Sequence, residues 1–129
     1  MLKGGEQNRL ITVFWYLSNV AKGGHTIFPL ANGAKGSSSS GDCDIPGALK
    51  VQPIKGEAII FYSLLSDGSY DKKSLHGGCP VIEGTKWSAN KWIWLQSKNL
   101  YSTILMFITN RKTEQMTTKN HFLYLLRGA

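Results

Sequence analysis

Residues 74–93 read SLHGGCPVIEGTKWSANKWI, and this stretch decides how the chain is expected to fold. His76 precedes Lys86 by ten residues, with a Pro-Val step and a glycine turn between them. The aromatic residues that follow the lysine favour a β-strand over residues 86–94. Because the side chains of a strand alternate with period two, every second residue lies on one face. That face comprises Lys86, Ser88, Asn90, Trp92 and Trp94.

Three earlier segments are also typical of strands. They read RLITVFWYLSNV at residues 9–20, GGHTIFP at 23–29 and ALKVQPIKGEAIIFYSL at 48–64. Each is rich in β-branched or aromatic residues, and Gly, Pro, Ser and Asn clusters separate them. In the first segment, one face is predicted to carry Leu10, Thr12, Phe14 and Tyr16.

Composition indicates one globular domain. A chain of 129 residues with 42% hydrophobic content is long enough for a single core. The short strand-like segments favour an all-β barrel or sandwich. Residues 31–47 form a polar loop with a serine run that we expect to be mobile.

The four segments, in this order, resemble the active-site half of prolyl 4-hydroxylases, a family of iron(II)- and 2-oxoglutarate-dependent dioxygenases. That family has an arginine-led apolar strand, then Gly-Gly-Glu-Thr-x-Phe-Pro, then Val-x-Pro-x-x-Gly-x-Ala-x-x-Phe, then the histidine and the lysine. The resemblance covers residues 6–95. It implies the C-terminal part of a double-stranded β-helix, or jelly-roll, dioxygenase domain, followed by an unmatched tail at residues 96–129.

The resemblance also implies roles for individual residues. His76 would be the last iron ligand, since such enzymes hold Fe(II) with two histidines and one carboxylate. Lys86 would hold the far carboxylate of 2-oxoglutarate, assisted by Tyr16 and Thr26, and Trp92 would wall the pocket. A second interpretation stays open, in which Tyr16 is a core aromatic whose hydroxyl reaches the rim.

The family reaction hydroxylates peptidyl proline at carbon 4 and uses Fe(II), oxygen, 2-oxoglutarate and L-ascorbate. Because Lys86 stands where several related dioxygenases have arginine, the resemblance implies collagen-like or hydroxyproline-rich substrates. It also implies the endoplasmic reticulum as the compartment, with a partner subunit as an alternative arrangement.

The chain departs from the family in two places. No His-x-Asp motif, the source of the other two iron ligands, occurs in the 129 residues. We therefore expect a truncated isoform, a fragment or an incomplete gene model, and a catalytically inactive binding protein is the alternative function. His25 stands where the family has glutamate, and we expect it to be a surface residue that points away from the pocket.

The tail carries more than half of the chain's basic excess. Residues 96–129 hold five basic residues and one acidic residue, or +4 of the net +7. The basic residues before the tail are scattered among loops, which disfavours a nucleic-acid-binding barrel. The apolar run at residues 100–108 is predicted to be a strand or a short buried helix, because it is too short to span a membrane.

Cys43 and Cys79 do not amount to a disulfide framework. A disulfide between them is one alternative, and we expect them to remain unpaired. A zinc site of cysteine and histidine is not predicted, because no ligand pair has zinc-finger spacing.

Overall fold

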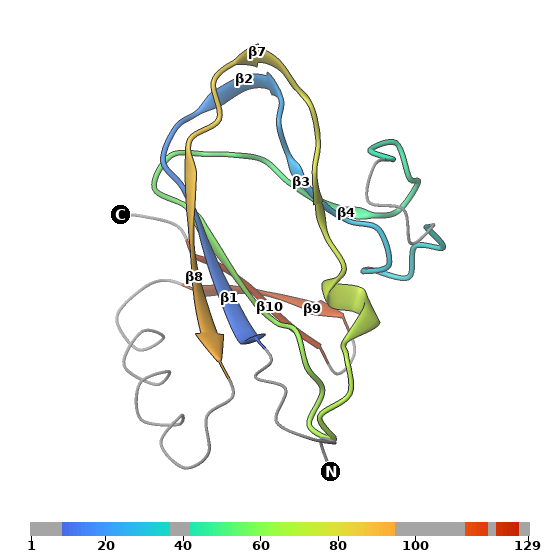
Figure 1. Cartoon of the computed structure of the whole chain (residues 1–129). Coiled ribbons are helices and arrows are strands. Elements are labelled where there is room, and N and C mark those ends of the chain that lie inside the picture. The colour runs from blue at the N-terminus through green and yellow to red at the C-terminus, as the bar shows by residue number, and fades with distance from the viewer. Residues whose placement is uncertain (1–8, 37–41, 95–112, 119–120, 127–129) are drawn as a thin grey trace.

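The computed structural model of the chain describes residues 9–36, 42–94, 113–118 and 121–126 (Figure 1). A single 3₁₀ turn, η1, spans Lys72–Ser74, and the remaining regular elements are strands. In chain order these strands are β1 (Arg9–Tyr16), β2 (Val20–Gly23), β3 (Thr26–Phe28), β4 (Leu49–Val51), β5 (Ala58–Tyr62), β6 (Gly77–Gly78), β7 (Val81–Gly84), β8 (Ser88–Trp94), β9 (Thr113–Thr118) and β10 (His121–Leu126).

The strands form three antiparallel sheets. The main sheet has the order β8-β1-β5-β10-β9, a second has the order β4-β3-β6, and β2 pairs with β7. In Figure 1 the β2–β7 pair continues the direction of β1 and β8 and arches over the top of the view. The all-β architecture predicted from the sequence is confirmed, and its form is that of part of a jelly roll.

The core that positions the site lies between the main sheet and the β4-β3-β6 sheet. Tyr16, Ile59 and Phe61 come from the main sheet, and they pack against Phe28 and Val51 of the smaller sheet. All are almost completely buried. The rings of Phe28 and Phe61 meet edge to face, with 5.4 Å between their centroids. Aromatic pairs in this geometry add to the stabilisation that burial alone gives.

A second apolar cluster lies on the other face of β1 and β5. It is built on Ile11, Ala58 and Ile60, and Leu10 packs against it. The prediction that Leu10 shares a face with Tyr16 is therefore wrong. The pairing of β1 with β8 shifts register between Arg9 and Ile11, and such an irregularity breaks the period-two alternation at that end of the strand.

Part of the tail joins the main sheet. β10 pairs with β5 from Leu123 opposite Phe61 to Leu126 opposite Ala58, and β9 pairs with β10. The predicted element at residues 100–108 and the serine run of the polar loop lie outside the described residues. Within the part of the chain that the structure describes, no helix is long and apolar enough to cross a membrane.

Candidate functional site

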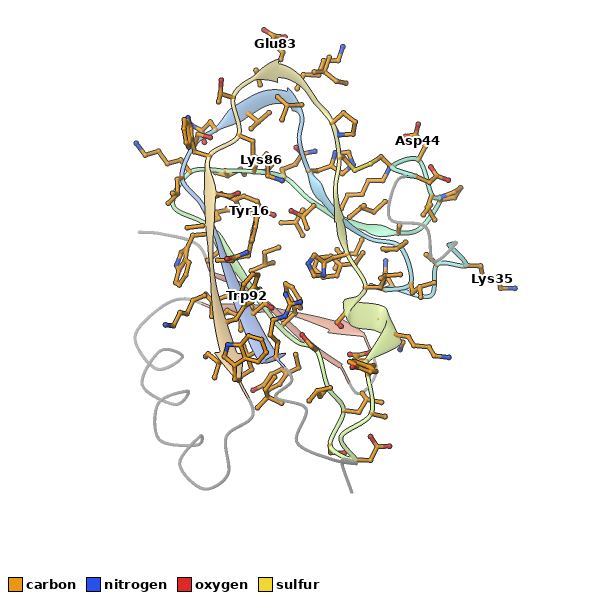
Figure 2. The ribbon with its side chains drawn as sticks, in the orientation of Figure 1. Tyr16, Lys35, Asp44, Glu83, Lys86 and Trp92 are labelled. Carbon is orange, nitrogen blue, oxygen red and sulfur yellow. A yellow bond between two sulfur atoms is a disulfide. The ribbon has the colours of Figure 1, made fainter. Side chains whose placement is uncertain are left out.

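Lys86 lies over the aromatic side chains that project from the inner face of β1. Its Nζ atom is 5.6 Å from the ring centroid of Tyr16 and 5.7 Å from that of Phe14. Figure 2 shows Lys86, Tyr16 and Trp92 following one another along β1 and β8. The register explains this arrangement, because Tyr16 is opposite Ser88 and Ser88 has the same parity as Lys86.

The environment of Lys86 is unusual for a lysine. The side chain is half-buried, and no carboxylate of the described residues lies within ion-pair distance of its Nζ atom. Burial lowers the pKa of Lys86 below its ordinary value, because removal from water disfavours the charged form. A partly desolvated ammonium group without an anion nearby is a suitable place for a ligand carboxylate.

Two hydroxyl groups lie at the base of this site. The Tyr16 hydroxyl donates a buried hydrogen bond of 2.7 Å to Oγ1 of Thr26. Burial is the main reason that the pKa of Tyr16 is raised to about 12, with its hydrogen bond to Thr26 opposing the shift and the nearby Glu57 charge adding to it. Tyr16 therefore stays neutral and remains a hydrogen-bond donor at any physiological pH.

The backbone around Lys86 is held by the loop after β1, a connection that sequence reasoning missed. The Ser18 hydroxyl donates to the Thr85 carbonyl at 2.7 Å and accepts from the Trp87 amide at 2.7 Å. The Leu17 amide also donates to the Trp87 carbonyl at 2.8 Å. Both neighbours of Lys86 are thus fixed to one serine, which limits where the lysine side chain can reach. No signal in the sequence marks this serine, because it lies 67 residues from its first partner.

His76 lies between η1 and β6, on the other side of the same core. Its ring packs against Phe61, with 4.7 Å between centroids, and against Phe28 at 5.7 Å. Nδ1 of His76 is 2.8 Å from the Ser74 carbonyl. A backbone carbonyl accepts a hydrogen bond, so this contact favours the tautomer with the proton on Nδ1 and leaves Nε2 unprotonated.

The turn that carries His76 is stabilised by Asp71. The Asp71 carboxylate caps η1 by accepting from the Lys73 amide at 2.9 Å, and the Ser74 hydroxyl donates to the Asp71 carbonyl at 2.8 Å. Side-chain caps of this kind satisfy donors that the first turn leaves unpaired. The cap therefore fixes the carbonyl against which His76 is oriented.

A cavity of about 240 Å³ opens beside His76. Arg9, Thr12 and Tyr70 line it together with residues of the His76 turn. Trp92 lies opposite Thr12 in the β1–β8 pairing, and the Arg9 guanidinium group is 4.6 Å from the centre of its ring. The cavity does not extend to Lys86, so His76 and Lys86 face the same core from two different ends.

His25 is not the surface residue that the sequence predicts. Both ring nitrogens are buried, and neither makes a hydrogen bond of good geometry among the described residues. Burial chiefly, followed by the Lys50 charge, lowers the pKa of His25, and an interaction with the Cys43 backbone opposes the shift. That His25 points away from the pocket stays a prediction, based on the alternation with Thr26, which bonds to Tyr16.

Cys43 and Cys79 form a disulfide with 5.9 Å between their Cα atoms, so the expectation of unpaired cysteines is wrong. They are 36 residues apart in the chain, and the fold brings the polar loop against β6. Cys79 packs in a small cluster with Ile27 and Ile45. Sequence spacing could not reveal this pairing because only two cysteines are present.

Comparison with known proteins adds the family. The model of the 2OG-Fe(II) oxygenase superfamily matches residues 2–94. Prolyl 4-hydroxylase 2 of Arabidopsis thaliana is 50% identical over 101 residues, which are 74% of this chain and 33% of that protein. Probable prolyl 4-hydroxylase 4 of the same plant is 46% identical over 103 residues, 75% of this chain and 34% of that protein.

Prolyl 4-hydroxylase 13 of Arabidopsis thaliana is 47% identical over 85 residues, 66% of this chain and 31% of that protein. The chain spans about a third of the length of these curated relatives. The matched part contains Tyr16 on β1 and Thr26 on β3, and it contains His76 and Lys86 in the segments just before β6 and β8. The chain therefore belongs to the 2OG-Fe(II) oxygenase superfamily, and the relatives found for it are prolyl 4-hydroxylases.

Proposed function

We propose that this chain supplies the 2-oxoglutarate-binding half and one iron ligand of a peptidyl-proline 4-dioxygenase. The proposal rests on the surroundings of Lys86. This half-buried cation has no carboxylate within ion-pair distance among the described residues, and it lies above the buried hydroxyl groups of Tyr16 and Thr26. When bound, Fe(II) and 2-oxoglutarate together activate oxygen for the hydroxylation.

Lys86 binds the far carboxylate of 2-oxoglutarate in this proposal. A charge-assisted hydrogen bond from an ammonium group is stronger than a neutral one, and partial burial strengthens it further. A hydrogen bond between two hydroxyls can reverse direction, so Thr26 can donate to Tyr16 and free the Tyr16 proton for the same carboxylate. Lys86 and Tyr16 then donate to the carboxylate, and Thr26 from the smaller sheet supports the Tyr16 hydroxyl.

His76 holds the iron through Nε2. Metal-binding histidines commonly donate their other ring proton to a carboxylate or a backbone carbonyl, and the Ser74 carbonyl is in that position. The packing of the ring on Phe61 and Phe28 restricts its rotation. The residues present therefore fit one of the three protein ligands of such a site, and the 129 residues contain no His-x-Asp to provide the other two.

Arg9 lines the cavity beside His76, and its guanidinium group lies over the ring of Trp92. In this proposal Trp92, which is 41% exposed, extends the wall and offers its ring to an apolar ligand. A proline ring is such a ligand, and the relatives are named for their action on prolyl groups. We propose a proline-containing peptide, collagen-like or hydroxyproline-rich, as the substrate, with L-ascorbate keeping the iron reduced.

We also propose the endoplasmic reticulum as the compartment. The Cys43–Cys79 disulfide supports this proposal, because such bonds persist in oxidising compartments and are rare in the cytosol.

A second candidate function is a binding protein without turnover. The absence of His-x-Asp from these residues favours it, because one histidine alone is a poor iron site. Such a chain would bind a proline-rich peptide or a partner subunit and release no succinate.

The test of the first candidate is a chimera that joins the upstream His-x-Asp segment of a prolyl 4-hydroxylase to this chain. With iron, ascorbate, 2-oxoglutarate and a proline-rich peptide, we expect succinate release matched by hydroxyproline. His76→Ala and Lys86→Ala should each abolish both products, while Lys91→Ala should not. A chimera that is folded and inactive, or active without His76, contradicts the proposal.

A further inference from the structure

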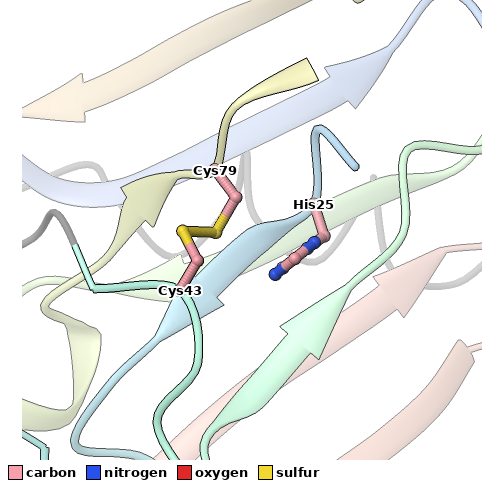
Figure 3. A group of neighbouring side chains, drawn as sticks. All are labelled: His25, Cys43 and Cys79. Carbon is pink, nitrogen blue, oxygen red and sulfur yellow. A yellow bond between two sulfur atoms is a disulfide. The ribbon is translucent and has the colours of Figure 1, made fainter. Parts of the chain in front are cut away.

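His25, Cys43 and Cys79 form a compact cluster (Figure 3), and the Lys86 charge is one of those that act on His25. The antiparallel pairing of Thr26 with Gly78 puts His25 next to Cys79, and the Cys79 amide donates to the His25 carbonyl at 2.9 Å. The disulfide brings Cys43 to the same place. The ligand atoms of the three side chains lie within 4.8 Å of one another.

The imidazole of His25 is poorly satisfied in the fold as it stands. Both ring nitrogens are buried, neither makes a hydrogen bond of good geometry among the described residues, and the Cys43 backbone interacts with the ring only in a poorer geometry. Buried polar groups are normally hydrogen-bonded, and an unsatisfied one destabilises the fold. An imidazole directed at two sulfur atoms is a common arrangement in metal sites, where nitrogen and sulfur ligands converge.

We propose that reduction of the Cys43–Cys79 disulfide converts this cluster into a zinc site held by His25, Cys43 and Cys79. In the oxidised chain the sulfur atoms carry no charge and are weak ligands, so the cluster does not bind zinc. Two molecules of a small thiol, or one dithiol, donate two electrons and two protons, which breaks the S–S bond and leaves two Cys thiols and one disulfide of the reductant. Binding of Zn²⁺ to the two thiolates then releases those two protons.

The geometry requires only a small rearrangement. Zinc binds sulfur at about 2.3 Å and nitrogen at about 2.0 Å, which in a tetrahedral site puts neighbouring ligand atoms roughly 3.5 to 3.8 Å apart. The two sulfur atoms, about 2.0 Å apart in any disulfide, separate when the bond is reduced and need to move apart by roughly 1.7 Å, while the His25 nitrogen, no more than 4.8 Å from them, needs to approach by about one ångström at most. A water molecule would fill the fourth position.

The surrounding charges are compatible with this site. Zn²⁺ with two thiolates is neutral overall, so it can sit against the buried apolar neighbours Ile27 and Ile45 without an unpaired charge. Lys50 is a nearby cation, and it is 3.9 Å from the carboxylate of Asp44. A neutral complex is not repelled by this pair. The three ligands come from different parts of the chain, which is why their sequence spacing is unlike that of a zinc finger.

Cobalt(II) titration of the full chain tests the proposal, because thiolate-bound cobalt absorbs light in a way that free cobalt does not. After reduction by a phosphine that does not bind metal, we expect one cobalt per chain with a thiolate charge-transfer band, displaced by zinc. The oxidised chain should show no such band. Circular dichroism of the reduced chain, with and without zinc, reports whether the sheets are retained.

His25→Ala should weaken zinc binding to the reduced chain by about tenfold or more, and Cys43→Ser should remove the charge-transfer band. Lys91→Ala is the matched control, because Lys91 lies on β8 outside the cluster and its loss should leave the band and the zinc affinity unchanged. A reduced chain without the band, or His25→Ala with wild-type zinc affinity, overturns the proposal. Loss of the band in Lys91→Ala would also overturn it, since the band would then not report on the three ligands.

Discussion

The hydroxyl of Tyr16 donates to Oγ1 of Thr26 at 2.7 Å. This bond links the main sheet to the β4-β3-β6 sheet, beneath the ammonium group of Lys86. The bond joins β1 to β3, ten residues apart in the chain. It holds two hydroxyl groups inside the core, where most neighbouring side chains are apolar. We interpret this pair as the floor of a carboxylate site.

The Tyr16–Thr26 bond should contribute to the stability of the chain itself. Tyr16→Phe leaves Oγ1 of Thr26 without its donor, and Thr26→Val leaves the Tyr16 hydroxyl without an acceptor. Each change should lower the free energy of unfolding by about 1–3 kcal/mol, because a buried polar group loses its partner. The double variant should be less destabilised than the sum, by about 1 kcal/mol. Urea unfolding measures the free energy of unfolding of the two single variants and the double variant. Strictly additive losses would show that the two hydroxyl groups have no coupling energy.

Ser18 should matter for ligand binding although it does not face the ligand. Ser18→Ala removes both hydrogen bonds that fix the backbone on either side of Lys86. We expect 2-oxoglutarate to bind about tenfold more weakly, since one to two modest hydrogen bonds would be lost from the positioning of the lysine. Ser69→Ala is the control, because that hydroxyl bonds only to Asp67 in an exposed turn. Equal affinities of the two variants in a binding titration would contradict this role.

As pH rises, the affinity for 2-oxoglutarate should begin to fall at a lower pH than it would if the pKa of Lys86 were that of an ordinary lysine. Burial lowers the pKa of Lys86, so the ammonium form in the free chain is fully present only below that lowered value. As pH rises through it, the cation is lost and carboxylate binding weakens. Tyr16, with a pKa of about 12, stays neutral over this interval. Lys86→Arg should remove the decline, because guanidinium remains charged. The same decline in Lys86→Arg would assign it to another group.

The chain as given should bind iron weakly. One histidine cannot replace a three-ligand site, since affinity depends on the number and geometry of the ligands. We expect residues 1–129 to show no succinate release coupled to proline hydroxylation. The strand β8 also lies at the edge of the main sheet in the described part of the chain, and exposed edges favour aggregation or pairing with another chain. Coupled turnover that disappears in His76→Ala would show that the other ligands come from elsewhere.

The sequence was sufficient to predict the strands that carry the site. Alternation over residues 86–94 and 9–16 correctly placed Tyr16 and Trp92 on one face and Lys91 on the other. Lys91 is paired with Val13, which packs against the cluster built on Ile11, Ala58 and Ile60. It failed for Leu10, because a register irregularity is decided by how two strands meet and not by either strand alone.

The contacts that sequence reasoning missed all join distant parts of the chain. The Ser18 contacts, the Cys43–Cys79 disulfide and the burial of His25 depend on which strands become neighbours. Period-two patterns report which face a residue is on, and they carry no information about its partner across the core. The roles of His76 and Lys86 came from the resemblance to a family, and they remain predictions.

An NMR titration of the chain with 2-oxoglutarate tests most directly whether Lys86 binds the carboxylate of this ligand. Lys86→Ala should lose about 2–3 kcal/mol of binding free energy, or roughly 30- to 150-fold in affinity, because one charge-assisted contact disappears from a half-buried site. Lys91→Ala, on the face of β8 opposite to that of Trp92, should bind as the wild-type chain does. Unchanged affinity in Lys86→Ala would contradict the account.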